Sequence, residues 1–141
     1  MRYTEKELEK MLKSEDWEIR KEIAGQGYGL DILINDVVFW VREEVARQGY
    51  GLDVLVNDID WRVRLAIAEQ GYGLEKLVND EEKWVRLEVA RQGFGLDILV
   101  NDESWWVRLA VARQGVGLDI LINDKDWEVR EVAKEMLNKK G

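Results

Sequence analysis

The sequence predicts an all-α protein: a right-handed α-solenoid of about six two-helix repeats, with a cap at each end. Three observations predict this architecture. The segment Gln-Gly-X-Gly-Leu recurs with a period of 22 residues, beginning at Gln26, Gln48, Gln70, Gln92 and Gln114. Each copy then carries apolar residues at helical spacing. Each copy also opens with two glycines, which suit a tight turn between helices.

The copies are unusually uniform, because nine of the 22 columns are identical in all five. We therefore interpret the whole chain as one repeat domain, residues 1–141. Its predicted units are an N-terminal cap (1–25), four repeats (26–47, 48–69, 70–91 and 92–113), and a last repeat with the C-terminal cap (114–141).

Both ends depart from the repeat as caps must, since nothing covers their outer faces. Thr4, followed three residues later by Glu7, predicts a capping box at the start of the first helix. Residues 132–140 drop the Gly-X-Gly turn and continue as a charged helix. These features indicate purpose-built caps.

Each repeat holds one long helix and one short α or 3₁₀ helix. In the second copy the long helix is predicted over residues 60–69, and a short piece over residues 52–56. The β-branched residues of that short piece also allow a strand, but the spacing of three between Leu52 and Leu55 favours a helical turn. Gly71 is expected to end the long helix in the left-handed region, and Gly73 to allow close contact with the next short helix.

The constant residues are interpreted as structural. Phosphate-binding loops also contain Gly-X-Gly, but those follow a strand and occur once per site. The aromatic residue between the glycines, as at Tyr50, is expected to pack one repeat on the next, with ligand contact as the alternative. An Asp and an Arg recur six residues apart, as in Asp58 and Arg64. Such pairs predict a ladder of charge-assisted hydrogen bonds along the stack, with a charged ligand groove as the alternative.

The composition excludes several chemistries. The chain has neither cysteine nor histidine, so it lacks the thiolate and imidazole groups that supply disulfides, most metal sites and most general bases near neutral pH. Every well-placed carboxylate recurs in each copy, which argues against a unique catalytic site. We expect no enzymatic activity, no cofactor and no metal.

The charge and hydropathy of the chain bear on its partners and location. A formal net charge of −8 repels nucleic-acid phosphates and anionic membrane surfaces. The first residues lack the apolar segment of a secretory signal, and the longest apolar run, residues 37–41, is far shorter than a bilayer span. We expect a cytoplasmic protein, or a recombinant one with no native compartment, that binds neither nucleic acid nor membrane.

The motif Asp, a few variable residues, Val-Arg, two residues and a Val-Ala-like pair resembles the second half of HEAT repeats. With the turn and the short Leu-rich helix, the unit is similar to the leucine-rich repeat variant family over roughly residues 14–133. This resemblance implies a curved all-α array used mostly as a scaffold. Two departures are the shorter period and the absence of proline, which both families use at their turns. The iron–sulfur cluster of some leucine-rich repeat variant proteins needs cysteine and does not carry over.

The columns that vary gather at the start and on one half of the long helix, and they are rich in tryptophan. The chain has seven tryptophans, all at the beginning of a long helix. A Trp- and Leu-rich face is typical of protein interfaces. The candidate partner-binding residues are Phe39, Trp40, Trp61, Leu65, Trp84, Leu87, Trp105, Trp106, Leu109 and Trp127. Packing between successive helices is the favoured interpretation for the four tryptophans that share one column, Trp17, Trp61, Trp105 and Trp127, with partner binding as the alternative.

We therefore expect a non-enzymatic, consensus-type and engineered repeat scaffold that binds a protein or peptide through this face. The alternative is a structural protein that uses the same face to bind a second copy of itself.

Overall fold

The computed structural model describes residues 2–140, which form helices and no strand. These residues group into two compact units, unit 1 ending at Tyr72 and unit 2 beginning at Gly73. In each unit nine-residue helices alternate with four-residue helices. The predicted fold class, an all-α solenoid of helix pairs, is confirmed.

The helices of unit 1 are α1 (Glu5–Leu12), α2 (Trp17–Gly25), α3 (Leu30–Leu33), α4 (Phe39–Arg47), α5 (Leu52–Leu55) and α6 (Trp61–Glu69). Those of unit 2 are α7 (Leu74–Leu77), α8 (Lys83–Arg91), α9 (Leu96–Leu99), α10 (Trp105–Arg113), α11 (Leu118–Leu121) and α12 (Trp127–Lys140). Thr4 and Glu7 form the predicted capping box at α1.

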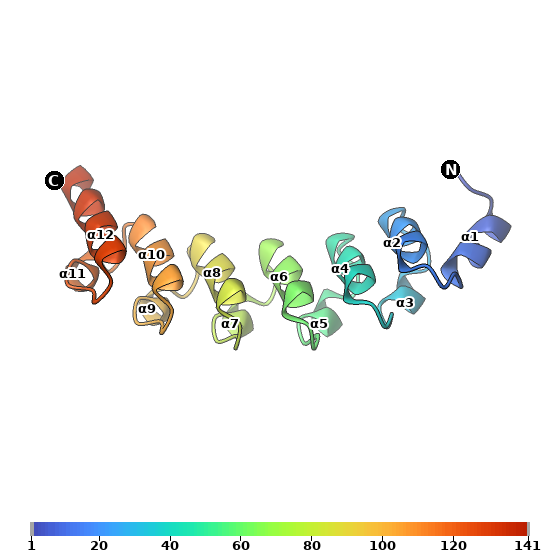
Figure 1. The fold of residues 1–141 in the computed structure, drawn as a ribbon, viewed down its shortest axis with the longest axis horizontal. Helices are drawn as coiled ribbons and strands as arrows, with labels where there is room; N and C mark the ends of the chain where they lie inside the picture. The colour runs from blue at the N-terminus through green and yellow to red at the C-terminus, as the bar shows by residue number, and fades with distance from the viewer. Residues whose placement is uncertain (1, 141) are drawn as a thin grey trace. The chain divides into compact units, whose positions relative to one another are not determined.

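Within each unit the long helices pack side by side, α2 on α4 on α6 and α8 on α10 on α12 (Figure 1). The short helices form a second row beneath them. One stripe of each long helix is fully buried, as at Val41, Val45 and Ala46 of α4, and the short helices add leucines such as Leu33. Because a four-residue helix is unstable alone, this shared core holds the short helices in place.

Glycine ends each nine-residue helix in the left-handed conformation, as the sequence predicts. At the end of α8, Gly93 has φ +78° and its N–H bonds Ala90 O, while the N–H of Phe94 bonds Val89 O. These two bonds form a Schellman motif. The second glycine, Gly95, has φ +65° and lies so close to the previous short-helix segment that a Cβ would stand 2.5 Å from Val78 Cγ2.

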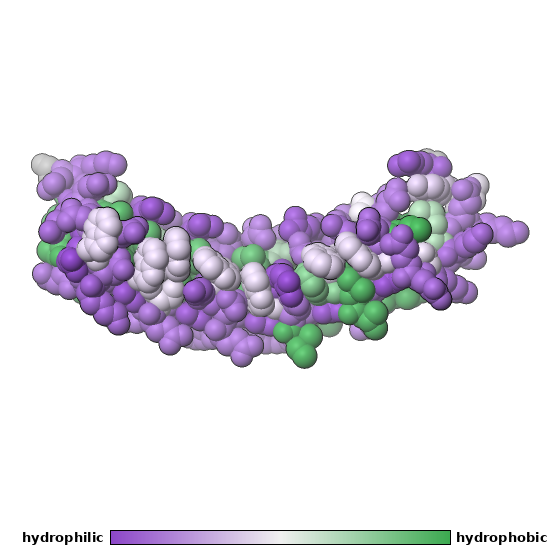
Figure 2. Space-filling model, viewed as in Figure 1, coloured by the Kyte–Doolittle hydropathy of each residue, from purple (hydrophilic) through white to green (hydrophobic). Residues whose placement is uncertain are grey.

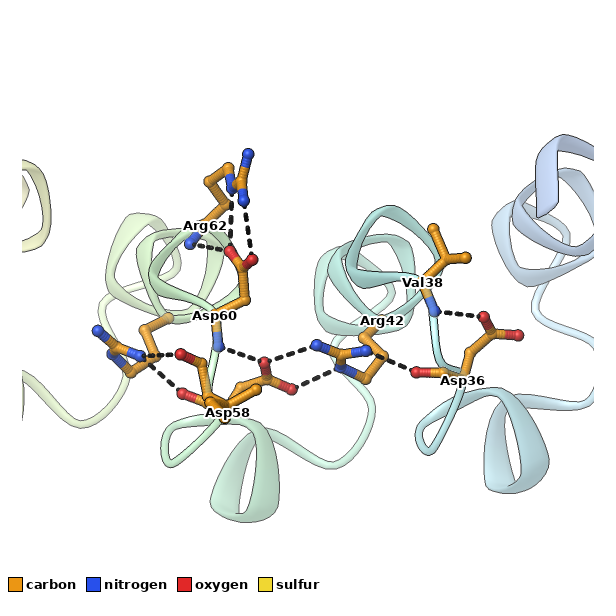
Figure 3. A network of polar contacts seen from close by, with 8 residues as sticks. Asp36, Val38, Arg42, Asp58, Asp60 and Arg62 are labelled. Atoms are coloured by element: carbon orange, nitrogen blue, oxygen red, sulfur yellow. Dashed lines mark hydrogen bonds and ion pairs between the residues drawn. The ribbon is translucent and has the colours of Figure 1, made fainter.

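An arginine–aspartate ladder joins successive repeats, confirming the predicted charge-assisted bonds. In unit 1, Arg42 Nε donates to Asp58 Oδ2 at 2.8 Å and Arg42 Nη2 to Asp58 Oδ1 at 3.1 Å (Figure 3). Further bidentate rungs of the same type join Arg20 to Asp36, Arg86 to Asp102 and Arg108 to Asp124. In each rung the aspartate lies 16 residues after the arginine, in the following repeat.

Each rung also fixes the loop before the long helix. Arg42 Nη1 donates to Asp36 O at 2.6 Å, so within a repeat the arginine binds the backbone carbonyl rather than the carboxylate. Asp58 Oδ1 also accepts the N–H of Asp60 at 2.9 Å. The hydrogen bond that Arg42 donates to Asp58 raises the pKa of Arg42, although burial opposes that shift. The side chains of Arg42 and Asp58 are only 12% and 7% exposed, which makes this a nearly buried ion pair.

We expect Asp58→Asn to lower the free energy of unfolding by about 3 kcal/mol, because it leaves a nearly buried guanidinium without its counter-ion. Asparagine keeps an oxygen that can accept the Asp60 N–H. The control is Glu43→Gln, which breaks the Arg47–Glu43 pair, whose arginine side chain is 55% exposed, and which should cost less than about 1 kcal/mol. Urea denaturation measures both, and equal losses would contradict the structural role of the ladder.

Two neighbouring glycines separate backbone strain from close packing. Gly93→Ala adds a Cβ with only Gln114 Oε1 nearby, so we expect a loss of about 1–2 kcal/mol from the left-handed backbone alone. Gly95→Ala has the same backbone penalty and also displaces Val78, which adds about 1–3 kcal/mol. Thermal unfolding of the two variants compares them directly. Identical melting temperatures would show that the close approach is unimportant.

Asp124 makes the stability of unit 2 depend on pH. Burial raises the pKa of Asp124, but hydrogen bonds from Arg108 and the Asp126 N–H outweigh it and leave the pKa below its ordinary 3.8. A carboxyl whose pKa is lowered by folding stabilises the folded state above the unfolded pKa, and this contribution is lost as the pH falls through the folded pKa. We expect the stability advantage of the wild type over Asp124→Asn to be constant above about pH 5 and to shrink below about pH 4. Urea unfolding over a pH series measures it, and an advantage independent of pH would contradict the assignment.

Candidate functional site

The variable aromatic residues lie where the long helices begin, in the first or second position of each helix. The ladder and the buried stripe fix those helices, so the aromatic positions are held by a rigid support. Figure 2 shows pale and green side chains interrupting the hydrophilic surface in both units. The aromatic residues form one cluster in unit 1 and another in unit 2.

The unit 1 cluster consists of Trp17, Phe39, Trp40, Trp61 and Arg62. The rings of Trp17 and Trp40 stack with centroids 4.8 Å apart, and those of Phe39 and Trp40 lie 4.4 Å apart. The guanidinium of Arg62 lies 3.7 Å from the Phe39 centroid and 5.5 Å from the Trp61 centroid. Two neighbouring long helices therefore hold a cation against an aromatic surface.

Asp60 anchors that cation. Its Oδ1 accepts from Arg62 Nε at 3.0 Å and its Oδ2 accepts from Arg62 Nη2 at 2.9 Å (Figure 3). The hydrogen bonds from Arg62 lower the pKa of Asp60, while the Asp60 carboxylate raises the pKa of Arg62. Asp60 also caps α6 by accepting the Arg62 N–H. One carboxylate thus begins the helix and positions the guanidinium.

In unit 2 the rings of Trp84, Trp105 and Trp106 and the Lys83 ammonium form a cluster, and Trp127 begins the next long helix, α12. These five residues are called the unit 2 cluster below. The Trp105 and Trp106 rings stack at 4.1 Å, and the Trp84 and Trp106 rings are tilted at 5.9 Å. The Lys83 ammonium lies 5.1 Å from the Trp84 centroid. An open pocket of 420 Å³ adjoins this cluster, lined by Glu81, Glu82, Lys83, Arg86, Glu103, Ser104, Trp105 and Trp106.

The ten sequence-predicted residues differ in exposure. Trp40, Trp106 and Trp127 are 43%, 40% and 63% exposed. Leu87 and Leu109 are buried and lie under the surface rather than on it. The partly buried ones are Phe39, Trp61, Leu65, Trp84 and Trp105.

The buried leucines follow from the packing of the long helices. α10 packs against α8 on one side and α12 on the other. The buried stripe of α10 is therefore wider than that of a helix with a neighbour on one side only. Leu109 and Ala110 of its variable half are consequently buried. The tryptophans for which inter-helix packing is predicted behave differently from one another. Trp17 stacks on the ring of Trp40 in the next long helix, whereas Trp127 is largely open to solvent.

Aliphatic side chains add to the exposed surface. Val37 and Ile59, in the loops before α4 and α6, are 91% and 92% exposed, and green atoms project from the lower edge of unit 1 in Figure 2. Sequence reasoning missed a second set on the short helices: Ile32, Val54, Ile98 and Ile120 are exposed. The sequence did contain a signal for their exposure. Lys76 occupies the same column in the third copy, and a lysine there indicates that the column faces solvent.

The described residues contain no group of three or more acidic side chains placed to hold a metal ion. Among the same residues, no helix is both long enough and apolar enough to cross a bilayer. Comparison with protein-family models gives no match, and no curated protein matches the sequence either.

Proposed function

We propose that this chain is a non-enzymatic repeat scaffold that binds a protein or peptide through the aromatic clusters at the starts of its long helices. The observation that carries the proposal is the exposure of Trp40, Trp106 and Trp127 on helices whose other side is fixed by a buried core. Large aromatic side chains on a rigid support bind with little loss of conformational entropy. The remaining variable residues differ from copy to copy, as a surface selected for one target would.

The proposal extends to origin and partners. Near-identical copies, dedicated caps and the lack of proline, cysteine and histidine favour a consensus-type, engineered array similar to HEAT and leucine-rich repeat variant units. The net charge of −8 favours a protein or peptide over nucleic acid and over an anionic membrane. No cofactor and no catalysis are part of this function.

Self-association is the second candidate function. Two exposed aliphatic residues in the loops of unit 1 favour it. Val37 and Ile59 occupy loop positions where other copies carry Glu81, Glu103 or Lys125. Almost complete exposure of two aliphatic side chains in the loops before α4 and α6 is typical of a surface that a partner covers. A second copy of the chain would cover it without any other molecule.

One variant pair tests both candidates. We expect peptides selected from a displayed random library to bind the wild type and to lose roughly thirtyfold in affinity for Trp40, Trp106 and Trp127 changed together to serine, because truncating hot-spot residues costs about 2 kcal/mol or more. The matched control changes three exposed short-helix residues, Ile32, Ile98 and Ile120, to serine. It should bind like the wild type.

Light scattering on a sizing column, over a hundredfold range of concentration, separates the two candidates. A monomer throughout supports binding to another partner. A dimer that becomes a monomer only in the tryptophan variant supports self-association. If no selected peptide distinguishes the tryptophan variant from its control and the chain stays monomeric, the proposed function is wrong.

A further inference from the structure

Repeat symmetry places two equivalent sites three repeats apart, one in each unit. A shift of 66 residues takes Asp60, Trp61 and Arg62 to Asp126, Trp127 and Glu128. The same shift takes Phe39 and Trp40, in the preceding long helix, to Trp105 and Trp106. α4 packs on α6 as α10 packs on α12, so equivalent residues have equivalent neighbours.

The unit 1 site is an occupied arginine site. The guanidinium of Arg62 lies 3.7 Å from the Phe39 centroid, and Asp60 holds its Nε and Nη2 at 3.0 and 2.9 Å. Trp61 lies beside it, with 5.5 Å between the guanidinium and the ring centroid. The molecule thus shows how this arrangement of side chains receives a planar cation.

The unit 2 site keeps the receiving groups but has no arginine. Trp105 replaces Phe39 and stacks on Trp106 as Phe39 contacts Trp40. Asp126 begins α12 by accepting the N–H of Glu128 at 3.0 Å, as Asp60 accepts the N–H of Arg62. Where Arg62 would lie there is the exposed Glu128, whose carboxylate makes no ion pair within residues 2–140.

We propose that Trp105, Trp127, Asp126 and Glu128 form a docking site for an arginine side chain of a bound peptide. Tryptophan is the best ring for a cation, and a guanidinium can stack on it while donating bidentate hydrogen bonds to a carboxylate. The 63% exposure of Trp127 leaves its ring accessible to such a side chain. The net charge of −8 also attracts a basic segment. This inference rests on the proposed peptide-binding function and specifies what the unit 2 cluster recognises.

The test uses the full chain and an acetylated, amidated peptide of alternating glycine and arginine, with its lysine counterpart as the second probe. Nuclear magnetic resonance of the indole N–H groups locates binding among the seven tryptophans. We expect the largest shifts at Trp105 and Trp127, and at least tenfold tighter binding of the arginine peptide than of the lysine peptide.

Two variants with the same change of charge separate a local site from general attraction. Glu128→Arg supplies the arginine from the chain itself, as in unit 1, and should weaken binding at least tenfold. The control is Glu18→Arg. Asp16, Trp17 and Glu18 occupy the same repeat columns as Asp126, Trp127 and Glu128, but no repeat precedes them to supply the ring that corresponds to Trp105. It should change the affinity less than threefold.

Three results would overturn the inference: equal weakening by both variants, equal affinity for the arginine and lysine peptides, or shifts confined to unit 1. Helix content and melting temperature confirm that each variant folds, and Glu128→Gln, which only removes the charge, should lie between the wild type and Glu128→Arg. If the arginine peptide does not bind but the selected library peptides still require the exposed tryptophans, the peptide-binding function is supported and only the arginine docking site is wrong.

Discussion

The nearly buried ion pair between the arginine of one repeat and the aspartate of the next is the interaction on which the rest of the structure depends. Burying a guanidinium and a carboxylate is unfavourable unless both are fully hydrogen-bonded. Here Arg42 donates hydrogen bonds to the Asp58 carboxylate and to the carbonyl of Asp36, while Asp58 also accepts one from the Asp60 N–H. The pair therefore fixes the distance between repeats and the loop that starts each long helix. That explains why the Asp and Arg columns do not vary.

The same constraint leaves the helix starts free to vary. Once the ladder, the buried stripe and the second glycine of each turn hold a long helix in place, its first two residues can change without loss of the core. In unit 1 these positions form an aromatic cluster that holds an arginine of the chain itself, Arg62. Unit 2 places three tryptophans within stacking distance and leaves its equivalent arginine position acidic. Stability and recognition are thus carried by different columns of one repeat.

Much of this fold could be predicted because the repeat displays the same local signals five times. The extent of α6 to within one residue, the left-handed glycines and the Thr4 capping box follow from helical spacing and turn chemistry. The burial of Leu109 could not be predicted from a helical wheel, since a wheel does not show that α8 and α12 flank α10 on both sides. Nor could the contact between Arg62 and Phe39, because side-chain directions across two repeats decide it. The division into two compact units has no signal in the motif, which continues unbroken through residue 72.

The central claim is that each repeat is stable through its neighbours and not by itself. Removing residues 26–47 tests it most directly, because the deletion is one full period and brings Arg20 into register with Asp58. The account predicts a folded, helical protein whose free energy of unfolding and whose urea dependence both fall, while a variant with residues 26–47 duplicated gains on both measures. A deletion variant as stable as the wild type, or one that does not fold at all, would contradict it.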